Sequence, residues 1–297
     1  MESISQLRAI CQKPKVSERE EIGMSYQDML TQYRLGLSVY FTWVFIYFGI
    51  SANTVTIFSG VAAIIGGILL SFNNIWFVVI GILFVEFYYL LDFCDGEVAR
   101  YHKKGSIIGW FLDWYMLFVR DAAVFIGLAF AAYNIEPSKL ILICGFLSVL
   151  IPIMDKTIIG CGWTVIGWTR LKDLHKGTNN KKGNKALNFE NKKELFNNKK
   201  SIILKIIKGV RFLSNSIFQH AWSPVILLLL AINQIVVNSY VDIEFDFRPY
   251  LILYCGIYGP FYVFNKLFLV VKRNSMEEKY NVLFHNEGKI TEKDYFF

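Results

Sequence analysis

Hydrophobic and polar positions along the chain alternate between long apolar runs and short polar connections. A helix that crosses a membrane needs about 20 mostly apolar residues. We expect six membrane-spanning helices, at 53–71, 75–95, 106–132, 139–166, 218–237 and 249–271. Asn53 is the expected N-cap of the first span, and Ser71 to Asn74 form the expected turn into the second.

The apolar segment 36–50 is short for a span and is crowded with Tyr, Phe and Trp. Such aromatic residues favour the membrane–water interface. We interpret this segment as an interfacial amphipathic helix in the cytoplasmic leaflet. The expected organisation is a cytoplasmic arm and interfacial helix at 1–50, a six-helix transmembrane domain at 51–271, and a cytoplasmic tail at 272–297.

Composition supports a membrane protein. The chain is 54% hydrophobic and 19% charged, and no charged residue occurs from Leu35 to Val85. A water-soluble surface could not accommodate such a gap, because soluble domains carry about 25% charged residues. Five scattered cysteines without a CxxC pair give neither a disulfide framework nor a zinc site. The predicted fold class is an all-α integral membrane protein.

The net charge of +7 reports topology. A nucleic-acid partner would need a soluble basic face, whereas here the basic residues lie between apolar runs. The loop 169–211 is rich in Lys and Arg, while 71–75, 133–139 and 237–248 hold at most one each. Because cytoplasmic loops carry the excess of Lys and Arg, we expect both termini, the basic loop and the active site on the cytoplasmic side.

Three smaller features leave alternatives open. An amphipathic helix is expected near 199–216, with one basic face that binds anionic membrane lipids or recognises an acceptor phosphate. That face consists of Lys205, Lys208 and Arg211. Glu86 either makes a polar contact between helices or lines an acceptor cavity. Asp155 and Lys156 point to different faces, so one of them faces the active-site cavity or both make structural pairs.

Three acidic residues stand out because intramembrane carboxylates are costly and mark functional sites by default. Asp92 and Asp95 share one helix face, and Asp113 lies near the same end of the next span, after a short hairpin. Their convergence would give an oxygen site suited to Mg²⁺ or Mn²⁺. Alternatively, the three acids only form ion pairs inside the bundle, with Arg100, Arg120 or Lys156.

The residues around these acids form an ordered string, Asp92-x2-Asp95-Gly96-x2-Ala99-Arg100-x8-Gly109-x3-Asp113. It resembles the signature of the CDP-alcohol phosphotransferase (CDP-alcohol phosphatidyltransferase) family, DxxDGxxAR-x8-G-x3-D-x3-D. The upstream segment GISANTVT, residues 49–56, is similar to the family's GISPNxVT, with Ala52 in place of proline. Together these similarities cover about 36–120, and residues 140–297 carry no matching motif.

The resemblance implies a transferase that moves a substituted phosphoryl group from a CDP-alcohol to an acceptor hydroxyl and releases CMP. It implies two metal ions, Mg²⁺ or Mn²⁺, with Asp92, Asp95 and Asp113 as ligands. It also implies a CDP-alcohol site and a homodimer. The residues carried over to that site are Asn53, Thr56, Gly96, Ala99, Arg100 and Gly109. The acceptor, a lipid or a polar alcohol, is not specified.

The fourth acid of the signature is missing, because Leu117 occupies its position. This removes one ligand of the second metal ion and the family's general base. Asp121 lies one further turn along the same helix, about 6 Å deeper. It is either the substitute base or the ion-pair partner of Arg120. Catalysis could otherwise rely on metal activation alone, use a different acceptor, or be absent.

Three functions therefore compete. The first is an active phosphotransferase in the synthesis of phospholipids or related headgroups and glycolipids. The second is a catalytically silent relative that binds CDP-alcohol or metal, which Leu117 favours. The third is a cation transporter or channel, which the ordered string argues against because conduction needs neither Gly96 nor Ala99.

Overall fold

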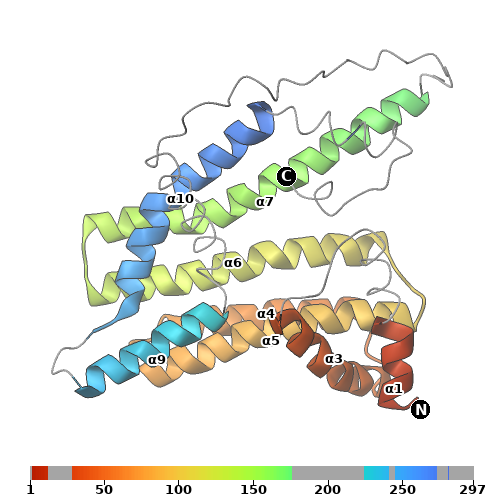
Figure 1. Cartoon of the computed structure of the whole chain (residues 1–297), viewed down its shortest axis with the longest axis horizontal. Coiled ribbons are helices and arrows are strands. Elements are labelled where there is room, and N and C mark those ends of the chain that lie inside the picture. Colours follow the sequence, from red (N-terminus) through yellow and green to blue (C-terminus); the bar gives the residue numbers. More distant parts are fainter. Residues whose placement is uncertain (1, 13–28, 176–223, 241–244, 273–279, 281–297) are drawn as a thin grey trace, which may run out of the picture.

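A computed structural model describes residues 2–12, 29–175, 224–240, 245–272 and 280 of the chain. All regular secondary structure in these ranges is helical (Figure 1). The helices are α1 (Ile4–Leu7), the π-helical turn η1 (Arg8–Gln12), α3 (Met29–Tyr47), α4 (Ala52–Leu70), α5 (Ile75–Tyr101), α6 (Ile107–Ile135), α7 (Lys139–His175), α9 (Pro224–Tyr240) and α10 (Phe247–Lys272).

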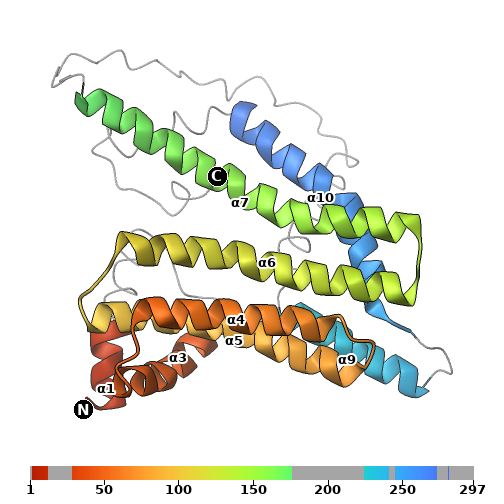
Figure 2. The ribbon, with the colours of Figure 1, turned by 180° about the vertical axis from the view of Figure 1, so that it is seen from behind.

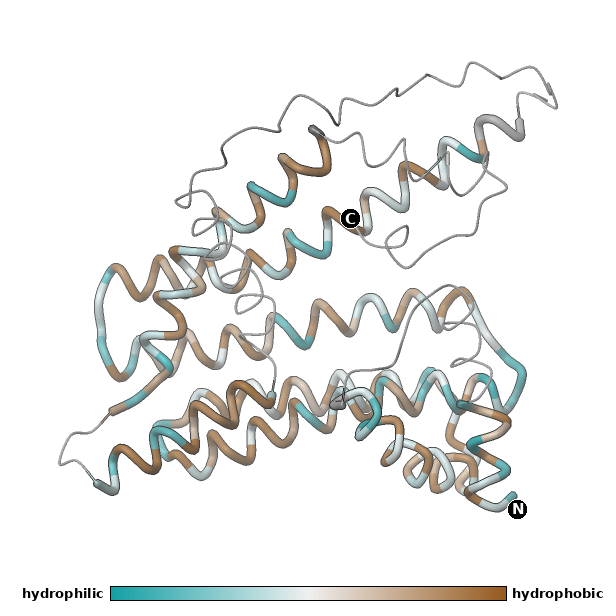
Figure 3. Tube along the Cα trace, in the orientation of Figure 1, coloured by the Kyte–Doolittle hydropathy of each residue, from teal (hydrophilic) through white to brown (hydrophobic). Residues whose placement is uncertain are grey.

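Five of the described helices, α4, α5, α6, α7 and α10, are long and apolar enough to cross a membrane. Apolar residues run along them in Figure 3, and many of these side chains are exposed, as expected where lipid is the solvent. The predicted class of an all-α integral membrane protein is confirmed. The apolar helix α9 has 17 described residues, about 26 Å of helix against about 30 Å of hydrocarbon. Its crossing, and with it the sixth span, stays a prediction.

Several predicted boundaries need correction. Helix α7 continues to His175, so residues 169–175 are helical and do not belong to a loop. Helix α9 ends at Tyr240 and α10 begins at Phe247, which shortens the predicted loop at 237–248. A helix can continue beyond its apolar part, so hydropathy alone misplaces such ends. The basic face of Lys205, Lys208 and Arg211, most of the 169–211 loop and nearly all of the tail lie outside the described residues.

The helices α4 to α7 lie side by side with similar axis directions (Figures 1 and 2). The turn from α5 to α6, residues 102–106, lies at the end of the bundle that also carries α1; we call this the motif end. The turns from α4 to α5 and from α6 to α7 lie at the opposite end, the far end. This alternation agrees with the predicted order of short loops along the chain.

The start of α4 is fixed by a turn that needs glycine. Gly49 has a φ of 66°, a left-handed conformation that glycine adopts without steric cost. Ser51 is the N-cap, and its side chain accepts a hydrogen bond from the backbone N–H of Thr54. The predicted cap at Asn53 is therefore wrong, because the helix begins at Ala52, two residues before the start that a cap at Asn53 implies. Asn53 is left with a side chain that points to the site described below.

Close helix packing in the bundle depends on small residues. Helix α4 packs against both α5 and α6, whereas α5 and α6 have few contacts with each other. A Cβ atom at Gly66 would lie 2.9 Å from the backbone oxygen of Gly81 on α5. Gly67 meets the backbone of Ala123 on α6 even more closely. Small residues at these positions let the backbones approach, as is typical of helix contacts in membranes.

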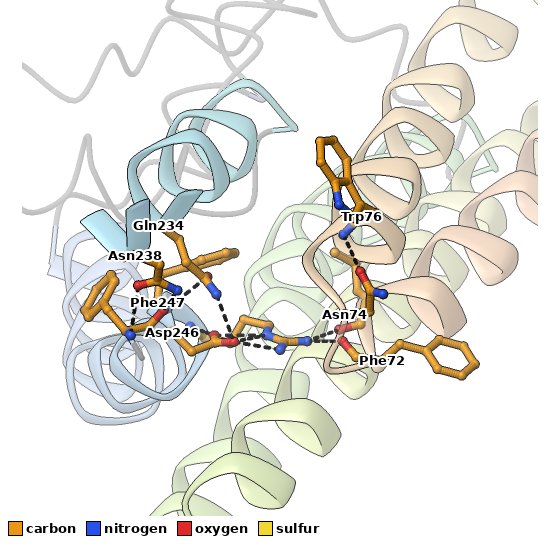
Figure 4. A network of polar contacts seen from close by, with 10 residues as sticks. Phe72, Asn74, Trp76, Gln234, Asn238, Asp246 and Phe247 are labelled. Atoms are coloured by element: carbon orange, nitrogen blue, oxygen red, sulfur yellow. Dashed lines mark hydrogen bonds and ion pairs between the residues drawn. The ribbon is translucent and has the colours of Figure 1, made fainter. Parts of the chain in front are cut away.

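A buried arginine holds the far end together, within the network of polar contacts around Phe72 and Asp246 that Figure 4 shows. Arg248, 1% exposed, donates hydrogen bonds to the backbone oxygens of Leu70 (3.0 Å) and Phe72 (2.6 Å). Its Nη2 atom also lies 2.7 Å from Asp246 Oδ2. The turn from α4 to α5 is thereby tied to the start of α10. Arg248 is the one Lys or Arg of the predicted loop 237–248 that was counted for topology, and it is instead part of the protein interior.

The N-terminal elements pack on α5 at the motif end through polar contacts. Glu97 on α5 is fully buried and accepts three hydrogen bonds. Its donors are Gln12 (2.8 Å), Ser38 (2.6 Å) and Thr42 (2.7 Å). The bonds from Ser38 and Thr42 anchor α3 to α5. Helix α3 itself begins at Met29, before the predicted segment 36–50. Its predicted place at the membrane interface stays a prediction.

We expect Glu97→Ala to lower the free energy of unfolding by about 3 kcal/mol. The substitution leaves buried donors of η1 and α3 without their acceptor, and each unsatisfied buried group costs about 1–3 kcal/mol. Denaturant unfolding in detergent would measure the loss, and hydrogen exchange should report deprotection of residues 4–12. Glu136→Ala, which removes an exposed carboxylate, is the matched control. Unchanged protection of 4–12 would contradict the anchoring role.

Candidate active site

The three acids singled out in the sequence lie near the motif end. Asp92 and Asp95 are on α5 and Asp113 is on α6. The carboxyl group of Asp95 interacts electrostatically with those of Asp92 and Asp113. Asp95 is 8% exposed, and its Oδ2 accepts a hydrogen bond from Thr56 Oγ1 at 2.6 Å. The bundle thus brings the acids of α5 and α6 within electrostatic reach of one another, and α4 orients one of them.

The acids can be tested for their fit to a divalent cation. Carboxylate oxygens are the donors that Mg²⁺ and Mn²⁺ prefer, and the three acids lie on α5 and α6, near the turn that joins these two helices. Among the described residues, however, no three His, Cys, Asp or Glu side chains are gathered closely enough to hold a metal ion as they stand. The donor chemistry and the placement therefore fit a cation, while the side chains do not form a ready coordination shell.

A cavity of about 360 Å³ opens at the motif end, and the residue of its lining nearest to the acids along α5 is Ala99, four residues after Asp95. It includes Asn53 and Ala99, two of the residues expected at the CDP-alcohol site. The full lining is Gly49, Ser51, Ala52, Asn53, Val98, Ala99, His102, Lys104 and Ser106. A Cβ atom at Gly109 would lie 3.0 Å from Asn53 Oδ1, so the absence of a side chain there leaves room for Asn53. The start of α4, the end of α5 and the start of α6 meet at this cavity.

Gly96 and Arg100 lie on the side of α5 that faces the N-terminal elements. A Cβ atom at Gly96 would lie 3.2 Å from Arg100 Nη1, so the glycine makes room for the guanidinium. Arg100 Nε donates a hydrogen bond to the backbone oxygen of Cys11 in η1. Arg100 was predicted to bind the diphosphate; here the N-terminal segment holds one of its donors.

Leu117 contacts a buried charge cluster on α6 and α7 through its backbone oxygen. The backbone oxygen of Leu117 accepts a hydrogen bond from Lys156 Nζ at 2.8 Å. The same Nζ atom pairs with Asp121 Oδ2, and Asp121 Oδ1 lies 2.6 Å from Arg120 Nη2. Asp121 is 2% exposed. Of the two interpretations of Asp121, the ion pair with Arg120 is thus present, and Lys156 is a second partner.

Two further carboxylates inside the described helices, Asp155 and Glu86, form ion pairs. Asp155 Oδ1 lies 2.6 Å from Lys266 Nζ on α10. Glu86 binds Arg34 on α3 through two hydrogen bonds, of 2.7 and 2.8 Å. This bidentate pair confirms that Glu86 makes a polar contact between helices.

Some residues at this end escaped the sequence interpretation. His102 and Lys104 line the cavity, but they lie in the unspecified eight-residue spacer of the motif, so no local pattern marks them. Ser106 caps α6 by accepting a hydrogen bond from Gly109 N at 2.9 Å, and its place three residues before Gly109 is a usable capping signal. Glu97 lies inside the motif at an unspecified position, and its donors are far away in the sequence.

The chain was also compared with known protein families. Residues 49–169, from the turn before α4 into α7, match the family model of CDP-alcohol phosphatidyltransferases. The matched range contains the string from Asp92 to Asp113 and the helices that carry it. No curated protein matches the chain.

Proposed function

We propose that the protein transfers a substituted phosphoryl group from a CDP-alcohol to the hydroxyl of a lipid or polar alcohol and releases CMP. The match of residues 49–169 to the CDP-alcohol phosphatidyltransferase family supports a CDP-alcohol phosphotransferase activity in general. The bond between phosphorus and the CMP oxygen breaks, a bond between phosphorus and the acceptor oxygen forms, and the acceptor hydroxyl loses its proton.

The observation that carries the proposal is the order of groups along α5. Ala99 lines the cavity at the motif end, and Asp95 and Asp92 follow on the same face, one and two turns deeper. A nucleotide in the cavity would therefore place its diphosphate beside the acids of α5 and α6. Asn53 and Gly109 complete the proposed donor site on the cavity side. Gly96 and Arg100 would join it when Arg100 exchanges its hydrogen bond to the backbone oxygen of Cys11 for one to the diphosphate.

Asp92, Asp95 and Asp113 would hold Mg²⁺ or Mn²⁺. A bound divalent cation neutralises charge that develops on the transferring phosphoryl oxygens. Thr56 orients Asp95 through its hydrogen bond of 2.6 Å. Leu117 offers no oxygen where the family signature has its fourth acid, so the second ion of the pair would have one ligand fewer and bind more weakly.

Asp121 is the proposed substitute base. Both of its carboxyl oxygens already hold a partner, Arg120 on Oδ1 and Lys156 on Oδ2. To accept the acceptor's proton, Asp121 must exchange one of these bonds for a bond to the substrate. Lys156 is the partner that can turn away, because its side chain is 16% exposed and Arg120 is 8% exposed.

A second candidate function is a catalytically silent relative that binds CDP-alcohol or metal. Leu117 and the fully occupied carboxylate of Asp121 favour it, since neither provides an unengaged base. The ordered donor residues favour the active enzyme, because binding alone does not require three acids next to the diphosphate.

The setting in the membrane is also a proposal. The Lys and Arg asymmetry favours a cytoplasmic motif end and cytoplasmic termini, the basic loop would contact anionic lipids, and the family resemblance favours a homodimer. In a Cys161→Ala background, which removes the exposed cysteine among the described residues, Glu136→Cys should react with an impermeant reagent added outside cells. Gly105→Cys at the motif end should not react. The reverse labelling pattern would overturn the orientation.

The proposed function is tested by CMP release from purified protein with Mg²⁺ or Mn²⁺. The donors are CDP-diacylglycerol and CDP-linked small alcohols, and the acceptors are glycerol 3-phosphate, serine, inositol phosphate and diacylglycerol. We expect metal-dependent CMP release with at least one pair. Metal-dependent CDP binding without CMP release from any pair would favour the silent relative, and no CDP binding at all would reject both.

A further inference from the structure

Tyr88 on α5 has a buried hydroxyl group that the fold leaves without a partner. The side chain is 0% exposed. Its Oη has no hydrogen-bond partner, and among the buried side-chain oxygen and nitrogen atoms of the described residues it is the single one in that state. Buried hydroxyl groups are nearly always hydrogen-bonded, because a lost hydrogen bond to water is otherwise not replaced. An orphan hydroxyl in a membrane protein therefore calls for a ligand.

The position of Tyr88 relates it to the acids. Tyr88, Asp92, Asp95 and Ala99 follow one another at spacings of four, three and four residues, which places them on one face of α5. The Tyr88 hydroxyl interacts electrostatically with Asp92, with Asp113 and with Arg120. Arg120 also lies over the Tyr88 ring, with its Cζ 5.2 Å from the ring centre. The hydroxyl thus belongs to the environment of the proposed reaction site, one turn deeper than Asp92.

The in-line geometry of phosphoryl transfer determines on which side of phosphorus the leaving CMP and the attacking hydroxyl lie. In a phosphoryl transfer, the attacking and leaving oxygens lie roughly in line on opposite sides of phosphorus. The cavity with Ala99 lies at the motif end of this face, so the leaving CMP lies on that side of the acids. The attacking hydroxyl must then approach from the deeper side. On the α5 face that carries Asp92 and Asp95, Tyr88 is the polar residue on the deeper side of these acids, away from the motif end.

We propose that Tyr88 binds the acceptor alcohol: its Oη donates a hydrogen bond to the oxygen of the attacking hydroxyl and orients that oxygen toward phosphorus. Tyr88 keeps its own proton throughout, and the proton of the acceptor goes to the base. The inference rests on the proposed phosphotransferase function and adds to it a residue that recognises the acceptor's hydroxyl. It also explains why the fold leaves the phenol unsatisfied, since the substrate supplies the missing partner.

The test is Tyr88→Phe, which removes only the oxygen, assayed with whichever acceptor among glycerol 3-phosphate, serine, inositol phosphate and diacylglycerol gives the fastest CMP release. We expect kcat/KM for the acceptor to fall about tenfold, the worth of one hydrogen bond to a substrate. The KM for the CDP-alcohol and the metal-dependent binding of CDP should not change. The melting temperature should stay the same or rise, because the variant removes an unsatisfied polar atom.

Tyr89→Phe is the matched control. Tyr89 lies next to Tyr88, but its ring lies between two guanidinium groups, with Arg34 Cζ at 4.4 Å and Arg120 Cζ at 4.7 Å from its centre. The Phe ring keeps that packing, so the acceptor kinetics should be those of the wild type.

Each outcome has a distinct meaning. Unchanged acceptor kinetics in Tyr88→Phe, with an active wild type, would overturn the role of Tyr88 and leave the proposed function standing. A lower melting temperature together with an unchanged kcat/KM for the acceptor would show a structural hydroxyl and overturn it too. A wild type that releases no CMP with any pair would overturn the proposed function and this inference with it.

Discussion

Asp95→Asn will reduce metal-dependent CMP release by at least about 100-fold. A metal ion at the transferring phosphoryl group supplies several kcal/mol of charge stabilisation, and about 1.4 kcal/mol corresponds to a factor of ten in rate. Asparagine can still accept the hydrogen bond from Thr56 Oγ1, so the packing of α4 on α5 is preserved. The change therefore removes a negative charge and leaves the local structure intact. Initial rates of CMP release at several Mg²⁺ concentrations would measure it.

The same loss is expected for Asp92→Asn and Asp113→Asn, because all three carboxylates are proposed to share the cation. Glu136→Gln, an exposed charge at the far end, should retain the activity of the wild type. Retention of Mg²⁺-dependent CDP binding in Asp95→Asn at the wild-type affinity would remove the metal site from this part of α5. Loss of folding would appear as a lower melting temperature and must be checked in parallel.

Asp121→Asn will lower the free energy of unfolding by about 3–5 kcal/mol, the cost of removing one partner of a buried ion pair. Arg120 and Lys156 would be left as two buried cations with no carboxylate between them. If Asp121 is also the base, kcat falls by about 10²–10⁴-fold. Denaturant unfolding in detergent and single-turnover CMP release would measure the two effects separately.

A double variant separates the base from the ion pair. Asp121→Asn combined with Lys156→Met removes the uncompensated cation and should recover part of the lost stability. A kcat that stays low in the double variant supports the base, whereas a kcat that returns to the wild-type value means that Asp121 is structural. Leu117→Asp addresses the silent relative: CMP release in this variant, with none in the wild type, would put that function first.

The elements that depend on local sequence could be predicted. Apolar runs of sufficient length gave the five long helices, and the turn from Ser71 to Asn74 follows from an Asn74 side chain that caps α5. The common face of Asp92 and Asp95 follows from their spacing alone. The proximity of Asp113 follows from the short hairpin between two antiparallel helices.

The polar contacts between distant segments could not be predicted. Glu97 looks like any charged residue near a helix end, and the residues that bury it lie 55 to 85 positions away. Arg34 reads as a polar residue just outside the apolar run, although it pairs with Glu86 in the middle of α5. Such pairs depend on how α3 packs on α5, and a single sequence gives no signal for that packing.

Arg248 also imposes an order on the making of the molecule. The backbone oxygens of Leu70 and Phe72 leave the ribosome 176 to 178 residues before the arginine that binds them. During synthesis, which proceeds from the N-terminus, the turn between α4 and α5 must stay hydrated, because water is then the hydrogen-bond donor to these two oxygens. The turn can be buried once α10 packs against it and Arg248 replaces the water. Burial of the far end thus follows the synthesis of α10. In a chain that stops before residue 248, the backbone oxygens of Leu70 and Phe72 would lack their arginine donor.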